Sequence, residues 1–163
     1  MFKKLIFAAM FAVFASPLLA TEALVLNQEE SPLKIVGYTV SYKSPDRGIG
    51  DGTIVHRLTL ENPSGASVVA YGVGFRTFDS FKRSMGRPFI GYDMSGVAVG
   101  SKATPIWENR ALSAYLFRGY GIGVAYVSIV RMEDGTIWRA DSNSISNQLT
   151  DLELDLTTPE DFE

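Results

Sequence analysis

The stretch SVVAYGVGFRTF, residues 67–78, decides the fold class. Large apolar side chains stand at every second position, namely Val69, Tyr71, Val73 and Phe75, and the positions between them hold Ala or Gly. A period of two is the spacing of a β-strand, in which successive side chains point to opposite faces. This stretch therefore predicts a strand with one bulky face and one small face.

Similar segments lie on both sides of this strand. Residues 53–61 alternate as well and place four side chains on one face: Ile54, His56, Leu58 and Leu60. Further strands are predicted at 34–42, 88–92, 96–99, 111–117 and 123–132, and at 137–139. The turns between them are marked by NPSG at 62–65 and by Asp134-Gly135, which suits a two-residue hairpin turn. Seven or eight short strands separated by turns are typical of a β-sandwich or a barrel.

The C-terminal segment has the spacing of a helix instead. Behind the capping residues Asp141 and Ser142, isoleucine or leucine recurs at 145, 149, 152 and 156, which predicts a short helix over 145–156. An alternating strand through 152, 154 and 156 is the other interpretation, and both stay open.

Two shorter patterns also predict local structure. Phe78, Phe81 and Met85 have helical spacing and predict a short helical turn. Three glycines between Gly119 and Gly123 predict a flexible bend between two strands.

The first twenty residues have the organisation of a secretory signal peptide. Lys3 and Lys4 precede an apolar stretch, and Ala20 offers a small residue for cleavage. The apolar stretch is shorter than the about 20 residues that a membrane-spanning helix needs. Cleavage after Ala20 leaves 143 residues with net charge −5. We expect an exported protein, periplasmic or extracellular, with no transmembrane segment after cleavage.

The chain then divides into four parts. These are the signal peptide 1–20, an N-terminal segment 21–33, a β-sandwich domain with its C-terminal helix at 34–156, and an acidic tail at 157–163 that we expect to be mobile.

The composition excludes several classes of function. The chain has no Cys and a single His, which rules out thiol chemistry and the usual zinc sites. His56 lies on an apolar strand face and is interpreted as a core residue, which argues against a Ser-His-Asp triad. Net charge −3 argues against nucleic acid as a partner. We expect no cofactor and no metal site.

Glycosidase chemistry needs only two carboxylates, so composition alone leaves it open. The candidates are Asp46, Asp51, Asp79 and Asp93. Asp46 and Asp51 lie in a Gly-rich turn, and Asp79 is suited to cap a helix, so we do not expect an enzyme.

The sequence between residues 58 and 79 resembles a known family. LTLEN at 58–62 ends one strand, a polar turn follows, and VAYGVGF at 69–75 runs into Phe78-Asp79. This order is similar to that of FxLYD-type extracytoplasmic modules, in which an Asn-bearing turn joins two strands and the second ends in an aromatic–Asp step. The resemblance covers about residues 34–140. It implies an immunoglobulin-like β-sandwich without catalysis, acting as an accessory or interaction domain.

Two groups of side chains are candidate binding sites. Aromatic rings on a sandwich surface contact sugars and peptides, and the candidates here are Trp107, Tyr120, Trp138 and Arg139. Only one of the adjacent Ile137 and Trp138 can face the core, and which one stays open. The second group is a basic patch that would dock the acidic tail of this chain or of a neighbour: Arg76, Lys82, Arg83 and Arg87.

We therefore expect an exported, non-catalytic binding or accessory module that contacts a protein or a cell-envelope component. Residues 22–27 are suited to an edge strand that pairs with a partner. The alternative is a carbohydrate-binding module or a small glycan-acting enzyme. Buried Trp rings and a bare sheet edge favour the first, whereas a concave site with exposed Trp and converging carboxylates favours the second.

Deletion of residues 157–163 is expected to weaken stability or assembly at low salt, because exposed ion pairs are reversible and screened by salt. Urea unfolding and size-exclusion chromatography at low and high salt measure this effect. A deletion that changes neither property at low salt would contradict tail docking.

Overall fold

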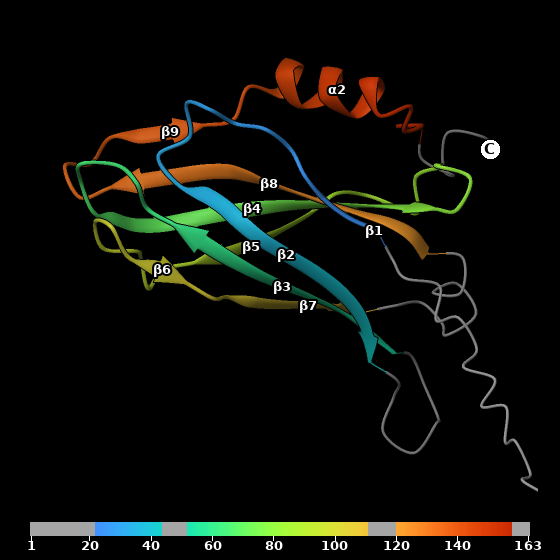
Figure 1. The fold of residues 1–163 in the computed structure, drawn as a ribbon, viewed down its shortest axis with the longest axis horizontal. Helices are drawn as coiled ribbons and strands as arrows, with labels where there is room; N and C mark the ends of the chain where they lie inside the picture. Colours follow the sequence, from blue (N-terminus) through green and yellow to red (C-terminus); the bar gives the residue numbers. More distant parts are fainter. Residues whose placement is uncertain (1–21, 44–51, 111–119, 158–163) are drawn as a thin grey trace, which may run out of the picture.

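The protein is described by a computed structural model over residues 22–43, 52–110 and 120–157. Two β-sheets face each other, and one helix lies on the outer side of the larger sheet (Figure 1). The predicted all-β sandwich with a short C-terminal helix is confirmed.

The larger sheet, sheet A, has the strand order β1-β8-β4-β5, and β9 also pairs with β8. Its strands are β1 (Glu22–Val25), β4 (Val68–Asp79), β5 (Phe89–Asp93), β8 (Tyr120–Met132) and β9 (Ile137–Arg139). Sheet B has the order β2-β3-β6, with β7 pairing β3. Its strands are β2 (Lys34–Lys43), β3 (Thr53–Glu61), β6 (Lys102–Ala103) and β7 (Ile106–Arg110). Among the strands that the structure describes, only β1 and β8 pair in parallel.

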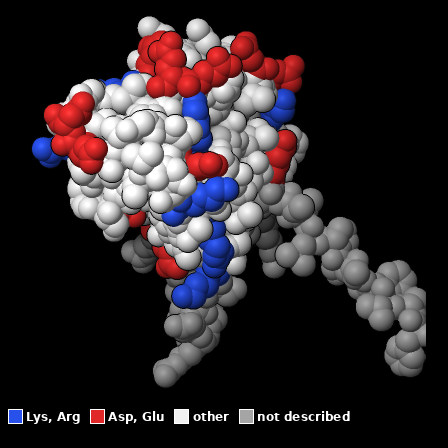
Figure 2. Space-filling view, turned by 60° about the vertical axis from the view of Figure 1, so that its left-hand side comes forward, with Lys and Arg blue, Asp and Glu red and all other residues white. Residues whose placement is uncertain are grey.

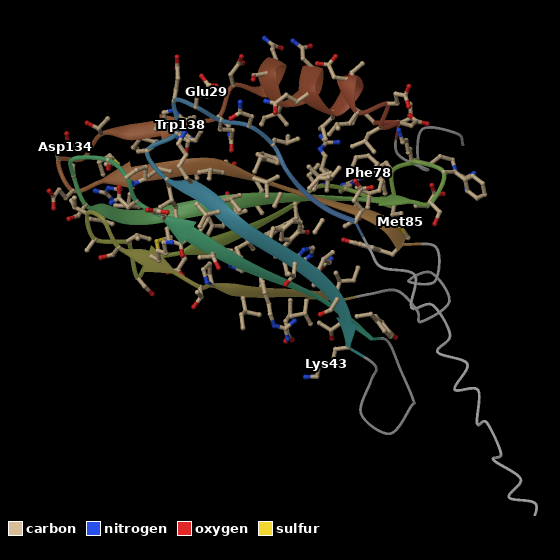
Figure 3. All side chains as sticks on the ribbon, in the orientation of Figure 1. Glu29, Lys43, Phe78, Met85, Asp134 and Trp138 are labelled. Carbon is tan, nitrogen blue, oxygen red and sulfur yellow. The ribbon has the colours of Figure 1, made fainter. Side chains whose placement is uncertain are left out.

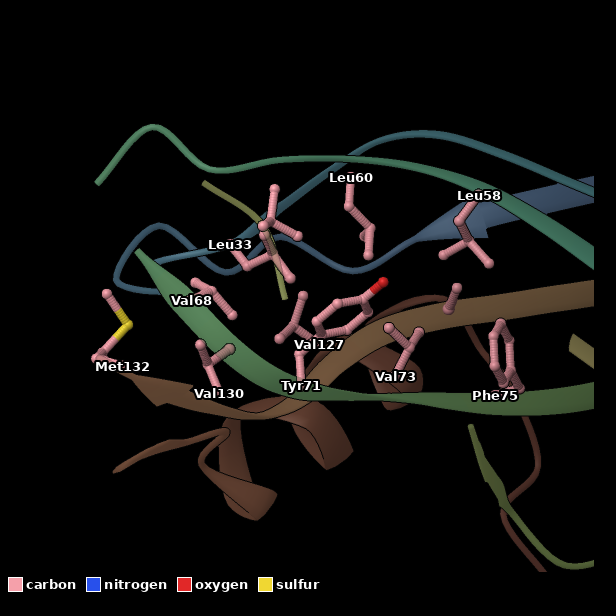
Figure 4. Packing of buried hydrophobic residues seen from close by; sticks show 12 residues of the cluster. Leu33, Leu58, Leu60, Val68, Tyr71, Val73, Phe75, Val127, Val130 and Met132 are labelled. Carbon is pink, nitrogen blue, oxygen red and sulfur yellow. The ribbon is translucent and has the colours of Figure 1, made fainter. Parts of the chain in front are cut away.

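The inner faces of β4 and β8 form the main core with sheet B. Figure 4 shows its side chains, from Leu33, Leu58 and Leu60 on one side to Tyr71, Val73, Phe75, Val127 and Val130 on the other. The alternation at 67–78 predicted Val69 on this face, which is wrong. A bulge between Val68 and Ala70 shifts the pattern, so Val68 is buried and Val69 is 40% exposed.

The outer faces of the same two strands form a second core with α2 (Ser142–Asp151). Ile145 and Leu149 of the helix pack with Phe78 of β4, which lies on the helix side of the sheet (Figure 3). Asp141 caps the helix as predicted, since its carboxylate accepts hydrogen bonds from the backbone of Asn143 and Ser144.

The C-terminal segment is neither a continuous helix nor a strand. The helix ends at Asp151, five residues before the predicted end. Glu153 then adopts φ 59°, and Asp155 forms a parallel bridge with Arg83. This turn lets Leu154 and Leu156 still pack under the helix.

The predicted helical turn through Phe78, Phe81 and Met85 is wrong. Phe78 continues strand β4, and the Asp79 carboxylate accepts hydrogen bonds from the backbone of Phe81 and Arg83. These bonds close a tight turn, in which Phe81 is 79% exposed rather than packed.

Three other local predictions also need correction. Residues 96–99 form only a bridge, between Val97 and Val68, and the strands β6 and β7 were not predicted. Residues 120–123 belong to β8 rather than to a bend, because Gly121 lets the backbone of Ser80 approach closely. The hairpin at Asp134-Gly135 is confirmed, although Met132 and Thr136 enclose three residues instead of two. The predicted strand 111–117 lies outside the described residues.

The turn between β3 and β4 is held by a buried asparagine. The Asn62 amide donates hydrogen bonds to the carbonyls of Ala66 and Val97, and its oxygen accepts two from Ser64. Its side chain is thus fully paired although it is 0% exposed.

Two glutamine side chains attach the N-terminal segment to the sandwich. β1 pairs with one part of the edge of β8, and β9 pairs with another part of the same edge. Between these two parts, the Gln28 amide donates to the Val127 carbonyl at 2.8 Å and accepts from the Val127 N–H at 2.7 Å. The Gln148 amide of α2 forms the same pair of hydrogen bonds with the Asn27 backbone: it donates to the carbonyl at 2.9 Å and accepts from the N–H at 2.8 Å. Residues 22–25 therefore pair within the chain's own sheet, and sheet A begins before residue 34.

The substitution Gln28→Glu is expected to lower the free energy of unfolding by about 1–3 kcal/mol, because a carboxylate cannot donate to the Val127 carbonyl. Asn147→Asp is the matched control, since Asn147 is exposed on α2 and makes the same change of amide to carboxylate. Urea unfolding measures both variants. Equal stability of the two would show that the Gln28 pairing contributes nothing.

Candidate functional site

The sole histidine sits in a polar cluster between the two sheets. Asn109 of β7 offers only an oxygen to His56, so the Nε2–H of His56 donates to Asn109 Oδ1 at 3.0 Å. The Nδ1 atom then accepts from the Tyr38 hydroxyl of β2 at 2.9 Å. The Tyr38 hydroxyl also interacts with that of Tyr120, and both lie over Gly123, where a Cβ would meet them at 2.8 and 2.9 Å.

Burial controls the charge state of this cluster. It lowers the pKa of His56 from 6.5 to about 4, although the bond with Asn109 acts in the opposite direction. Burial also raises the pKa values of Tyr38 and Tyr120 well above their usual range. His56 is 0% exposed, and its ring lies tilted against the Phe75 ring with the two ring centroids 4.3 Å apart. The cluster is thus neutral near pH 7, and both histidine nitrogens are occupied, which confirms the interpretation of His56 as a core residue.

Trp107 closes one open side of the sandwich. Its ring lies against Gly91 of β5, where a Cβ would come within 2.6 Å of it. The indole N–H donates to the Tyr92 carbonyl at 3.4 Å, and the ring meets Tyr71 edge-on. Most of this indole therefore serves contact between the sheets.

Of the adjacent residues Ile137 and Trp138, it is Trp138 that faces the core. It packs against the main core, and its neighbour Ile137 is 51% exposed. Arg139 is exposed beside it on the outer face of sheet A, whereas Tyr120 is 4% exposed. Because β9 and β5 are separated by two strands, Trp138 and Trp107 lie about 14 Å apart or more. The four predicted ligand residues are not brought together, and their binding role stays a prediction.

The predicted basic patch splits into two parts. Lys82 forms an ion pair with Glu153 at 2.9 Å, and its carbonyl accepts from the Asp155 backbone. Arg83 pairs with Asp79 at 2.7 Å. Two members of the patch therefore hold the start of the acidic C-terminal stretch, while residues 158–163 lie outside the described part of the chain. Arg76 lies in β4, and Arg87 lies just before β5.

The two candidate carboxylates within the described residues, Asp79 and Asp93, do not form a glycosidase pair. Asp93 faces Tyr71 across β5 and β4, so it is eight residues from Asp79 along β4, or about 26 Å. Glycosidase pairs are separated by only about 5–10 Å. Burial alone would raise the pKa of Asp93, but hydrogen bonds from Ser95 and Tyr71 hold it below its usual range. Asp46 and Asp51 lie outside the described residues.

The structure reveals an exposed surface that the sequence analysis missed. Helix α2 covers only one half of the outer face of sheet A (Figure 1). We call the other half the open face: it consists of Gly72, Gly74, Ile90, Tyr92, Tyr126 and Ile129, with Arg76, Arg131 and Arg139 around them. The alternation of Ile90 and Tyr92 opposite two glycines of β4 was the signal available in the sequence.

Other features of a ligand site are absent from the described residues. Between β1 and β2 lies a cleft of about 250 Å³, with neither an aromatic ring nor a carboxylate in its lining, which consists of Val25, Leu26, Asn27, Gln28, Leu33, Lys34, Ile35 and Val127. No three His, Asp or Glu side chains in the described ranges gather as metal ligands. No helix within those ranges is long and apolar enough to cross a membrane.

Comparisons with known proteins find similarity in structure alone. No family model matches the sequence, and no curated protein matches it. A chain described as a hypothetical protein from Peptoclostridium difficile 630 is similar in structure, with 12% identity and a TM-score of 0.42. The similarity covers 76% of this chain and 92% of that one.

Stability is expected to fall by about 3 kcal/mol as the pH drops from 6.5 to 4, because the unfolded chain binds the His56 proton throughout this range and the folded chain does not. His56→Gln should remove this part of the pH dependence. Tyr38→Phe is the control, since it retains the buried imidazole and should retain the slope. Urea unfolding at several pH values measures it, and an unchanged slope in His56→Gln would contradict the assignment.

Proposed function

We propose that this chain is an exported, non-catalytic β-sandwich module that binds a protein or a cell-envelope component. The observation that carries the proposal is the open face, which combines exposed aromatic, aliphatic and arginine side chains. Tyrosine and arginine are enriched where proteins bind each other. Export rests on the signal-peptide pattern of residues 1–20, and the resemblance to FxLYD-type modules points to the same class of function.

The packing of the aromatic residues supports this proposal over a glycan-binding site. Both tryptophans are half-buried and pack against the main core. A sugar-stacking platform needs a ring face that is open to the ligand. The described cleft offers no ring, and Asp79 and Asp93 stand too far apart to converge on one substrate.

In iodide quenching of the mature protein, both tryptophans should be quenched less than free tryptophan, and envelope glycans should leave their emission unchanged. Packing within the core is the physical reason. The variants Trp107→Phe and Trp138→Phe assign the signal to each ring. A tryptophan that iodide reaches freely and a glycan protects would overturn the proposal in favour of carbohydrate binding.

A further inference from the structure

We propose that the open face of sheet A docks a polypeptide segment of another protein that carries both acidic and apolar side chains. This inference rests on the proposed binding function and names the surface and the class of partner.

The centre of the open face is an apolar surface formed by three neighbouring strands. Gly72 and Gly74 of β4 have no side chains and are themselves buried. The Tyr126 ring covers Gly74, where a Cβ would come within 2.3 Å of it. Tyr92 and Ile129 cover Gly72 from the two neighbouring strands, and a Cβ there would meet them at 3.0 and 2.9 Å. The side chains of β5 and β8 therefore form one apolar surface across β4.

The apolar side chains of this surface are only partly covered. Tyr92 is 59% exposed and Ile90 is 37% exposed, both on edge strand β5. Tyr126 packs against the helix-side core and so marks the limit of the cover that α2 provides. Neighbouring apolar side chains that stay exposed in this way mark a candidate interaction site.

The charge of the open face is uncompensated. Among the described residues, no acidic side chain pairs with Arg76, Arg131 or Arg139, and the Nε atom of Arg76 is buried without a hydrogen-bond partner. In contrast, Lys82, Arg83 and Lys102 each have a carboxylate partner. In a chain of net charge −3, three unpaired arginines around one apolar surface complement an acidic partner.

A second copy of this chain fits the open face less well. Figure 2 shows acidic side chains gathered at the top of the molecule, the side on which α2 lies. The exposed surface of α2 itself is formed by serine and asparagine, and offers few apolar groups to contact the open face. A segment with alternating acidic and apolar side chains supplies both the charge and the apolar contact.

The test uses a synthetic peptide titrated into the isotope-labelled exported protein at low salt. The peptide GDLEIDVEFDG alternates acidic and apolar side chains and occurs nowhere in this chain. The matched neutral peptide is GNLQINVQFNG. We expect the acidic peptide to shift the amide resonances of β5, β8 and β9, and the neutral peptide to bind about tenfold more weakly or not at all.

Charge reversal on the protein locates the contact. R131E/R139E should weaken binding of the acidic peptide about tenfold or more, whereas K43E/K102E, with the same charge change on exposed residues of sheet B, should not. R131Q/R139Q repeats the test if the reversed variant fails to fold. Tyr92→Ala should also weaken binding.

Four results would overturn the proposal. The first two are equal affinity of the protein for both peptides, and equal affinity of R131E/R139E and the wild type for the acidic peptide. The other two are resonance shifts centred on residues 79–85 instead of the open face, and resonance shifts that follow the protein concentration without any peptide. A photo-crosslinking residue at position 92 separates this failure from that of the proposed function. If it captures a partner in the producing cell while the acidic peptide does not bind, the binding function stands and the acidic partner is wrong.

Discussion

The pairing of β4 with β8 is the interaction on which the rest of the structure depends. Its register runs from Val68 opposite Met132 to Asp79 opposite Tyr120. Because side chains alternate along both strands, one face of this pair carries the main core and the other carries the core under α2. A slip by one residue would exchange the two faces and expose both cores. The three irregular positions in this register therefore matter for the fold, since they determine which side chains of β4 and β8 point toward sheet B and which point toward α2.

The same pair explains where a binding surface is available. Both faces of β4 and β8 must be covered to bury their apolar side chains, but α2 is only ten residues long. It covers Phe78, Ile122 and Val124 and leaves Ile90 and Tyr92 of β5 exposed. The inner face offers no such surface, because fully buried His56 and its partly buried partners Tyr38 and Asn109 form a neutral cluster between the sheets. The fold thus separates a closed structural interior from one open outer surface.

The sequence predicts those features that depend on neighbouring residues. Alternation at 53–61 places His56 in the core, and Asp141 is a recognisable helix cap. The sequence does not predict contacts in which one or two side-chain hydrogen bonds decide the local structure. Gln28 and Val127 are 99 residues apart, and Phe78, Phe81 and Met85 have helical spacing although Asp79 closes a turn between them. The open face was missed for the same reason, because its residues come from four strands and converge only when β4 pairs with β5 and β8.

Hydrogen exchange of the backbone amides tests the central role of the β4–β8 pair most directly. Amides that bond the two strands to each other should exchange only when the whole domain unfolds, because opening them exposes both cores. Amides of β2 and β3 in sheet B, which contributes no residue to the core under α2, should exchange earlier or at the same rate. Slower exchange in β2 and β3 than in β4 and β8 would contradict the account, since sheet B would then be the element that holds the fold together.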